Sequence, residues 1–196
     1  MDREGFQMRS LYTIGFLYIG VSLYALLIRP APDMTPTTTA VADFGGDAGQ
    51  WFQAVKPYCN SVEAEMIHKR VPPPDTDEAP GFSAACYALA GKVDRARAVI
   101  LTVSSGERWK AAGTVFDVAH AIADAGDDES AGPIMELVVE FWPNHWQALY
   151  HAGMARYGLG QPRLAQQYLQ QFLEHYPEED GWTKSARQAL QQIAEQ

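Results

Sequence analysis

Five histidines are the side chains in this 196-residue sequence best suited to metal or acid–base chemistry: His68, His120, His145, His151 and His175. No two of them have the i, i+4 spacing with which one helix presents a pair of imidazoles to zinc, and the chain contains neither HExxH nor CxxC. The sequence therefore predicts no metal site and no cofactor.

Catalytic motifs are missing from the sequence as well. It contains no GxGxxG, no GxxxxGK[ST] and no G-x-S-x-G, and no Cys–His pair can be placed in one pocket. Asp127, Asp128 and Glu129 are the densest acidic cluster in a helical region, and they are better explained as favourable charges at a helix N-terminus than as paired catalytic carboxylates. We expect a non-enzymatic protein with no catalytic residues.

A long apolar run occupies residues 11–28, which contain no charged side chain. As a helix it would extend roughly 27 Å, about the thickness of the bilayer's hydrocarbon core. A cleaved signal peptide is the alternative, but it usually has a shorter apolar region followed closely by small residues. The sequence predicts one transmembrane helix at 11–28, in contact with the lipid bilayer.

The few basic residues near this run suggest its orientation. Arg3 and Arg9 precede it, whereas Arg29 is the only basic residue between it and Lys56. Because cytoplasmic flanks carry more Lys and Arg, residues 1–10 are expected in the cytoplasm. This places the protein in a bacterial inner membrane as a single-pass chain with a periplasmic C-terminal domain.

The exported part is acidic and holds both cysteines. From Pro30 onward it has 12 Lys and Arg against 22 Asp and Glu, which argues against nucleic-acid binding. An oxidising compartment would let Cys59 and Cys86 form a disulfide. The alternative, two buried free thiols, stays open.

Two segments lead from the anchor to a helical domain. Residues 29–46, rich in Pro, Thr and Gly, have no apolar periodicity and are predicted to be a flexible linker. Residues 47–77 form an N-terminal helical segment, in which Pro57 is expected to divide helices at 47–56 and 58–70, and residues 75–81 are expected to form a loop.

The remaining sequence repeats itself at a fixed period. Gly126, Ala131 and Pro143 recur 34 residues later as Gly160, Ala165 and Pro177, and Gly91 and Ala96 begin a degenerate third copy. The second half of each unit carries one apolar stripe at helical spacing. The alternation of apolar and polar residues that is typical of a β-strand does not occur in the sequence, so the expected class is all-α.

These residues resemble the tetratricopeptide repeat family, whose 34-residue unit is a helical hairpin with small residues at fixed positions and a terminal proline. The resemblance implies a degenerate unit at 78–111, units at 112–145 and 146–179, and a capping helix at 180–196. Leu149 and Val115 stand where the family usually has Trp, so these repeats are divergent. The matching positions are Ala119, Gly126, Ala131, Met135 and Pro143 in one unit, and Gly153, Gly160, Ala165, Leu169 and Pro177 in the next.

The resemblance also implies an inner face that binds proteins, formed mainly by the first helix of each unit. Transferred residue by residue, its partner-binding positions are Phe116, His120, Tyr150, Met154 and Tyr157. Aromatic and Met side chains there would suit an apolar peptide or helix. The alternative is that neighbouring repeats of the same chain cover several of them.

The layout is similar to that of accessory subunits in large bacterial membrane complexes, and a photosynthetic reaction-centre–light-harvesting assembly is one candidate host. We therefore expect a structural accessory subunit whose partners are other protein subunits. The alternative is a periplasmic-facing assembly factor or chaperone that binds substrate proteins transiently.

Overall fold

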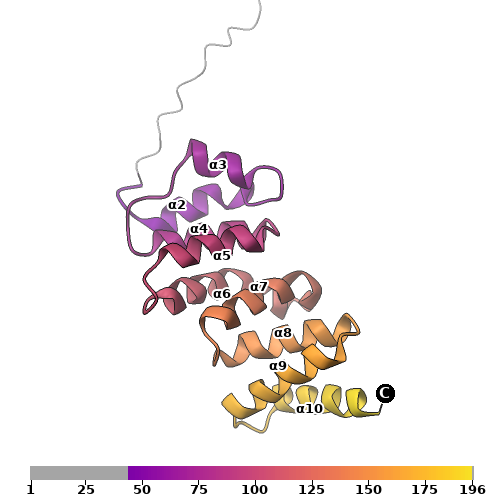
Figure 1. Ribbon diagram of the computed structural model, residues 1–196. Coiled ribbons are helices and arrows are strands. Elements are labelled where there is room, and N and C mark those ends of the chain that lie inside the picture. The colour runs from indigo at the N-terminus through magenta and orange to yellow at the C-terminus, as the bar shows by residue number, and fades with distance from the viewer. Residues whose placement is uncertain (1–43, 196) are drawn as a thin grey trace, which may run out of the picture. The chain divides into compact units, whose positions relative to one another are not determined.

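The computed structural model describes residues 44–195, and every regular element in this range is a helix (Figure 1). The elements are α2 (Ala48–Val55), the short 3-10 helix η1 (Lys56–Tyr58), α3 (Ala64–Arg70), α4 (Ala79–Leu89), α5 (Val93–Thr102), α6 (Arg108–Asp124), α7 (Asp128–Phe141), α8 (Trp146–Gly158), α9 (Pro162–His175) and α10 (Gly181–Ala194). The predicted all-α class is confirmed for this part of the chain.

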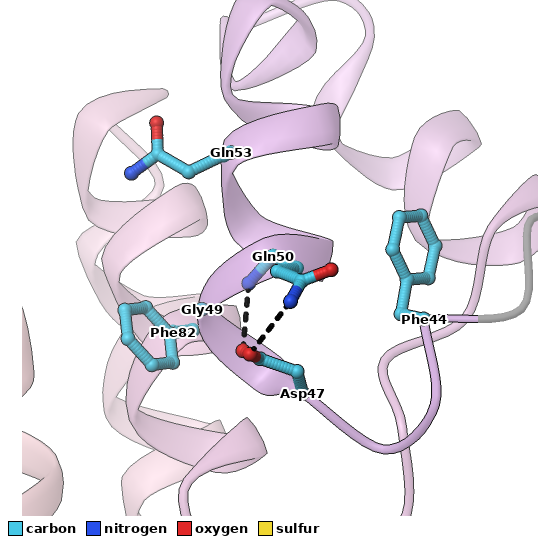
Figure 2. Close-up of a pocket in the computed structure, with 6 residues that line it drawn as sticks. All are labelled: Phe44, Asp47, Gly49, Gln50, Gln53 and Phe82. Carbon is cyan, nitrogen blue, oxygen red and sulfur yellow. Dashed lines mark hydrogen bonds between the residues drawn. The ribbon is translucent and has the colours of Figure 1, made fainter.

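Helix α2 begins at a side-chain cap. The carboxylate of Asp47 accepts hydrogen bonds from the backbone N–H of Gln50 at 2.9 Å and from its side-chain amide at 3.0 Å (Figure 2). This cap satisfies an N–H group in the first turn that has no partner within the helix. The helix then buries Trp51, Phe52 and Val55.

The structure differs from the sequence-based expectation between α2 and α4. The second helix starts at Ala64 and not at residue 58, because Pro57 lies in η1 and the Asn60 side chain accepts hydrogen bonds from the N–H groups of Val62 and Glu63. Such an Asn-centred turn competes with helix formation. Helix α4 begins within the predicted loop, since Pro80 suits a first helical turn.

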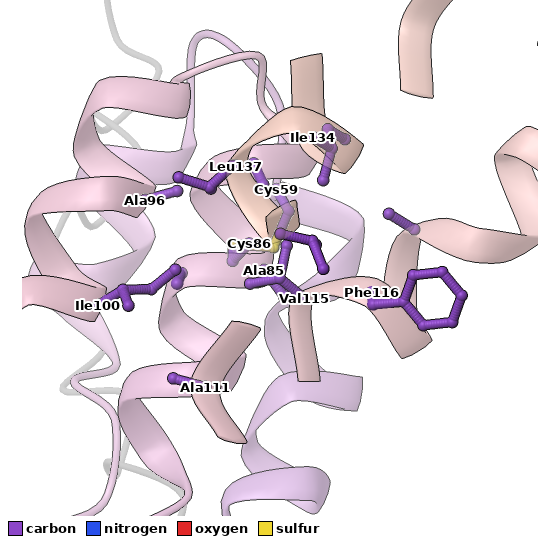
Figure 3. Close-up of a cluster of buried hydrophobic side chains, with 14 of the residues drawn as sticks. Cys59, Ala85, Cys86, Ala96, Ile100, Ala111, Val115, Phe116, Ile134 and Leu137 are labelled. Carbon is purple, nitrogen blue, oxygen red and sulfur yellow. A yellow bond between two sulfur atoms is a disulfide. The ribbon is translucent and has the colours of Figure 1, made fainter. Parts of the chain in front are cut away.

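A disulfide joins the loop after η1 to α4. Cys59 and Cys86 are bonded, with their Cα atoms 4.9 Å apart and a sequence separation of 27. Both cysteines belong to the larger hydrophobic core, some of whose buried side chains Figure 3 shows. The N-terminal helices are thereby linked covalently to the hairpins that follow.

Three helical hairpins follow: α4 with α5, α6 with α7, and α8 with α9. The first helix of each ends before a glycine with positive φ, namely Gly91 at 70°, Gly126 at 83° and Gly160 at 66°. A left-handed residue at this position reverses the chain and lets the next N–H groups bond to carbonyls of the last turn. The recurring glycine of the sequence is therefore the hairpin turn.

The recurring alanine lies where paired helices touch. Ala96, Ala131 and Ala165 are each 0% exposed, near the start of α5, α7 and α9. Two glycines permit a similarly close approach: a Cβ on Gly132 would lie 2.5 Å from the Ala155 Cβ, and one on Gly153 would lie 2.6 Å from Leu169 Cδ2. Only small side chains fit at these contacts.

Two hydrophobic clusters result from this packing. The larger one includes residues of α2 to α8, and the smaller one joins α8, α9 and α10 through Leu149, Phe172 and Ala186. The helices follow one another along the stack in chain order, so α10 covers the last hairpin (Figure 1). This is the position expected of a capping helix.

Residues 44–195 include no helix that is both apolar and long enough to cross a bilayer. The predicted transmembrane helix at 11–28, the preceding residues 1–10 and the linker up to residue 43 lie outside the described residues.

Candidate functional site

Two consecutive repeats contribute histidines to one site. Helix α6 carries His120 and Asp124 one turn apart, so both side chains share a helical face. Helix α8 carries His151, which is 3% exposed. The His120 and His151 ring centroids are 5.3 Å apart, with the rings nearly perpendicular.

The Asp124 carboxylate lies between the two imidazoles. Its Oδ1 is 3.3 Å from His120 Nε2 and 3.8 Å from His151 Nε2. Both Nε2 atoms are buried, and neither has a hydrogen-bond partner. Burial lowers the pKa of His120, which favours the neutral ring, although the Asp124 charge acts in the opposite direction.

Asp128, the first residue of α7, contacts the other ring nitrogen of His151. Its Oδ1 lies 3.2 Å from His151 Nδ1. A carboxylate only accepts hydrogen bonds, so in the neutral ring this contact places the proton on Nδ1 and leaves Nε2 as an acceptor. The neighbouring Asp127 has a separate role as N-cap of α7, accepting from the Ser130 N–H at 3.1 Å.

An open pocket of about 570 Å³ adjoins these groups. The first turn of α10 closes one side of it with Trp182, whose ring packs edge-on against Tyr150 at 4.6 Å and His151 at 5.4 Å. Asp180 is the N-cap of α10, and its carboxylate also accepts a hydrogen bond from the Tyr176 hydroxyl at 2.7 Å. The lining residues are Ala123, Asp124, Asp128, Tyr150, His151, Asp180, Gly181, Trp182 and Ser185.

Four of the five predicted partner-binding side chains remain partly exposed. His120, Tyr150, Met154 and Tyr157 are half-buried, and all but His120 lie on α8 beside the smaller cluster. Tyr157 donates a hydrogen bond to Gln192 of α10. This arrangement brings Tyr150 and His120 to the pocket region, while Met154 and Tyr157 continue along α8.

Phe116, the fifth predicted position, is only 6% exposed. Its ring stacks on His120 at 4.5 Å and lies 4.1 Å from the His145 ring. Phe116 packs with the larger cluster. Its side chain is therefore covered by the chain itself, which was the alternative to partner binding.

Sequence reasoning assigned no site role to four members of this site: Asp124, Asp128, His151 and Trp182. The i, i+4 spacing of His120 and Asp124 on one helix was a usable signal, because it places imidazole and carboxylate on the same face. Asp128 and Trp182 gave no comparable signal, since they approach His151 and Tyr150 only through the packing of separate helices.

Comparison with known proteins supports the helical-repeat assignment. Residues 147–179 match the family model described as Tetratricopeptide repeat, and they span α8, α9 and the turn between them. No curated protein and no solved structure matches the chain. Repeats of this family are typically non-catalytic interaction modules. Residues 147–179 are therefore similar to a tetratricopeptide repeat, and they lie within the all-helical architecture of residues 44–195.

Proposed function

We propose that this protein is a non-enzymatic, membrane-anchored interaction module that stabilises a larger bacterial membrane complex from its periplasmic side. The observation that carries the proposal is the stack of helical hairpins, one of which matches the tetratricopeptide repeat family. Such stacks present an extended concave surface to other proteins. The charge-free apolar run at 11–28 supports a bilayer anchor.

The docking surface proposed here is the inner side of α8, where Tyr150, Met154 and Tyr157 are half-buried. Tyr and Met offer large apolar area to a partner segment, and a tyrosine hydroxyl adds a hydrogen bond. Because α10 and α9 hold these rings in place, little side-chain freedom is lost on binding. An apolar peptide or helix of a neighbouring subunit fits this surface.

The compartment proposal rests on the cysteine chemistry and the flanking charges. A disulfide between Cys59 and Cys86 persists in an oxidising compartment such as the periplasm and is rare in the cytosol. Arg3 and Arg9 on the other side of the apolar run favour a cytoplasmic N-terminus.

Mild detergent extraction of native membranes tests the proposal. A subunit should be recovered in a fixed stoichiometry with the same proteins, and a photosynthetic reaction-centre–light-harvesting assembly is one host to look for. Recovery of mostly free protein would instead favour the transient assembly factor or chaperone.

The docking surface is tested by a Met154→Ala, Tyr157→Ala double variant. Removing two contact side chains at an interface centre should weaken capture of the co-purifying subunits by roughly 30-fold, about 2 kcal/mol. Tyr58→Ala is the matched control, because Tyr58 is 44% exposed and lies in η1, far along the chain from α8. Unchanged capture by a folded double variant would exclude this surface.

A further inference from the structure

The side chains of His120, Asp124 and His151 have the composition of a transition-metal site. Each offers one ligand atom, and the three atoms all lie within 4.8 Å of one another. Two imidazole nitrogens with one carboxylate oxygen are a donor set that suits Zn²⁺ and its neighbours in the first transition series.

The polar atoms at this position lack the partners that a purely structural cluster would supply. Both Nε2 atoms are buried without a hydrogen bond, although Asp124 Oδ1 lies 3.3 and 3.8 Å away. At 3.3 Å, a His120 Nε2–H directed at that oxygen would form a hydrogen bond, so the geometry does not correspond to one, and His151 Nε2 at 3.8 Å is beyond hydrogen-bonding distance. Buried polar atoms without a partner are unfavourable and call for an explanation.

The contact between His151 Nδ1 and Asp128 leaves His151 Nε2 available as a metal ligand. Asp128 Oδ1 lies 3.2 Å from Nδ1, which fixes the ring orientation and keeps the proton on Nδ1. Metal-bound histidines commonly have this second contact to a carboxylate. His151 Nε2 then carries a free lone pair and lies 3.8 Å from Asp124 Oδ1.

We propose that His120, Asp124 and His151 bind one Zn²⁺ ion, with Asp128 as the positioning residue for His151. This differs from the sequence-based expectation of no metal site, and it goes beyond the proposed function. Ligand atoms of a tetrahedral zinc site are about 3.4 Å apart, close to the two measured separations from Asp124 Oδ1. The side chains of His120 and Asp124 are 22% and 52% exposed, so they have room for the remaining adjustment.

The pocket supplies the open coordination position and the route of entry. Asp124, Asp128 and His151 all line it, so a water molecule can reach the fourth position from solvent. With three protein ligands and one open position, the site differs from a closed four-ligand structural zinc site. The ion would link α6 to α8, which belong to successive repeats.

Calorimetric titration of Zn²⁺ into the full-length chain, purified without a histidine tag and stripped with a chelator, tests the proposal. We expect one equivalent to bind. His120→Ala and Asp124→Asn should each weaken binding by at least 100-fold, and Asp128→Asn by about 10- to 100-fold. His175→Ala is the matched control, since this exposed α9 histidine lies outside the site and should leave the affinity unchanged.

Two further measurements separate loss of a ligand from loss of the fold. Asp124→Asn changes a half-exposed side chain, so its far-UV circular dichroism should match that of the unmodified chain. Zn²⁺ should raise the thermal midpoint of the unmodified chain and leave that of Asp124→Asn unchanged. Absence of binding, or equal affinity in Asp124→Asn and His175→Ala, would overturn the proposal. Partner capture that persists without zinc would leave the proposed function intact.

Discussion

His68 is a half-buried, titratable side chain that connects α3 to α4. Its Nδ1 donates to the Ala64 carbonyl at 2.7 Å, so its Nε2 accepts from the Ser83 hydroxyl at 2.9 Å on α4. The ring also stacks on Tyr87 at 4.3 Å and contacts Trp51 edge-on. Burial lowers the pKa of His68 below 6.5, although the Ala64 carbonyl and the Glu65 charge raise it.

This lowered pKa predicts that acid destabilises the fold. The unfolded chain binds the proton more tightly than the folded chain, so stability is fully present above about pH 6.5 and declines as the pH falls below it. We expect the free energy of unfolding, measured in urea at pH 7.5 and 5.5, to fall less in His68→Gln than in the unmodified chain. An equal fall in both would show that His68 does not contribute to this decline.

Two glycines of α8 differ in whether the packing of the helices leaves room for a side chain. Gly153 and Gly158 both lie on α8, but only Gly153 faces α9, where an added Cβ would also approach Leu169 Cγ at 2.7 Å. Gly158 has no atom within 4 Å of such a Cβ. The two positions therefore form a matched pair on one helix.

Gly153→Ala should destabilise the chain by about 1–3 kcal/mol, because α8 and α9 must separate or distort to admit the methyl group. Gly158→Ala should be neutral or stabilising by up to about 1 kcal/mol, since alanine favours the helix and meets no neighbour. Denaturant unfolding of both variants measures the difference. Equal stabilities would contradict the close approach of α8 and α9.

The disulfide gives a second prediction about how the helices are held together. Cys59→Ala with Cys86→Ala should lower the free energy of unfolding by about 2–4 kcal/mol, because a 27-residue loop is no longer closed in the unfolded chain. Urea unfolding compares the two forms. Intact mass with and without reduction, after alkylation, shows whether the bond exists in the isolated protein, and two free thiols would contradict it.

At the scale of the whole helical domain, residues 44–195 form a one-dimensional stack, so damage at one end should stay local. Each hairpin contacts chiefly its neighbours, and α10 packs only on α8 and α9 in the pairs with substantial contact. A chain ending at Glu179 should show faster amide hydrogen exchange in α8 and α9, with α4 and α5 nearly unchanged. Uniformly faster exchange would indicate one cooperative unit in place of a stack.

Features of this structure that depend on residues close in sequence could be predicted, whereas those that depend on the packing of separate helices could not. Gly126, Ala131 and Pro143 act through turn geometry and immediate packing, so their 34-residue recurrence was enough to indicate hairpins. The Asn60 turn depends on side-chain hydrogen bonds that the proline pattern did not reveal. The meeting of His120 with His151 depends on how successive repeats are stacked, which no spacing within one helix specifies.

The Cys59–Cys86 bond also determines how the domain would respond to mechanical tension. A force applied at residue 44 could peel away α2 and η1, but it would then reach Cys59 and pass through the sulfur bridge into α4. The segment between the two cysteines, including α3, would bear no load. Tension applied ahead of α2 would thus reach the first hairpin without unravelling the chain between the two cysteines.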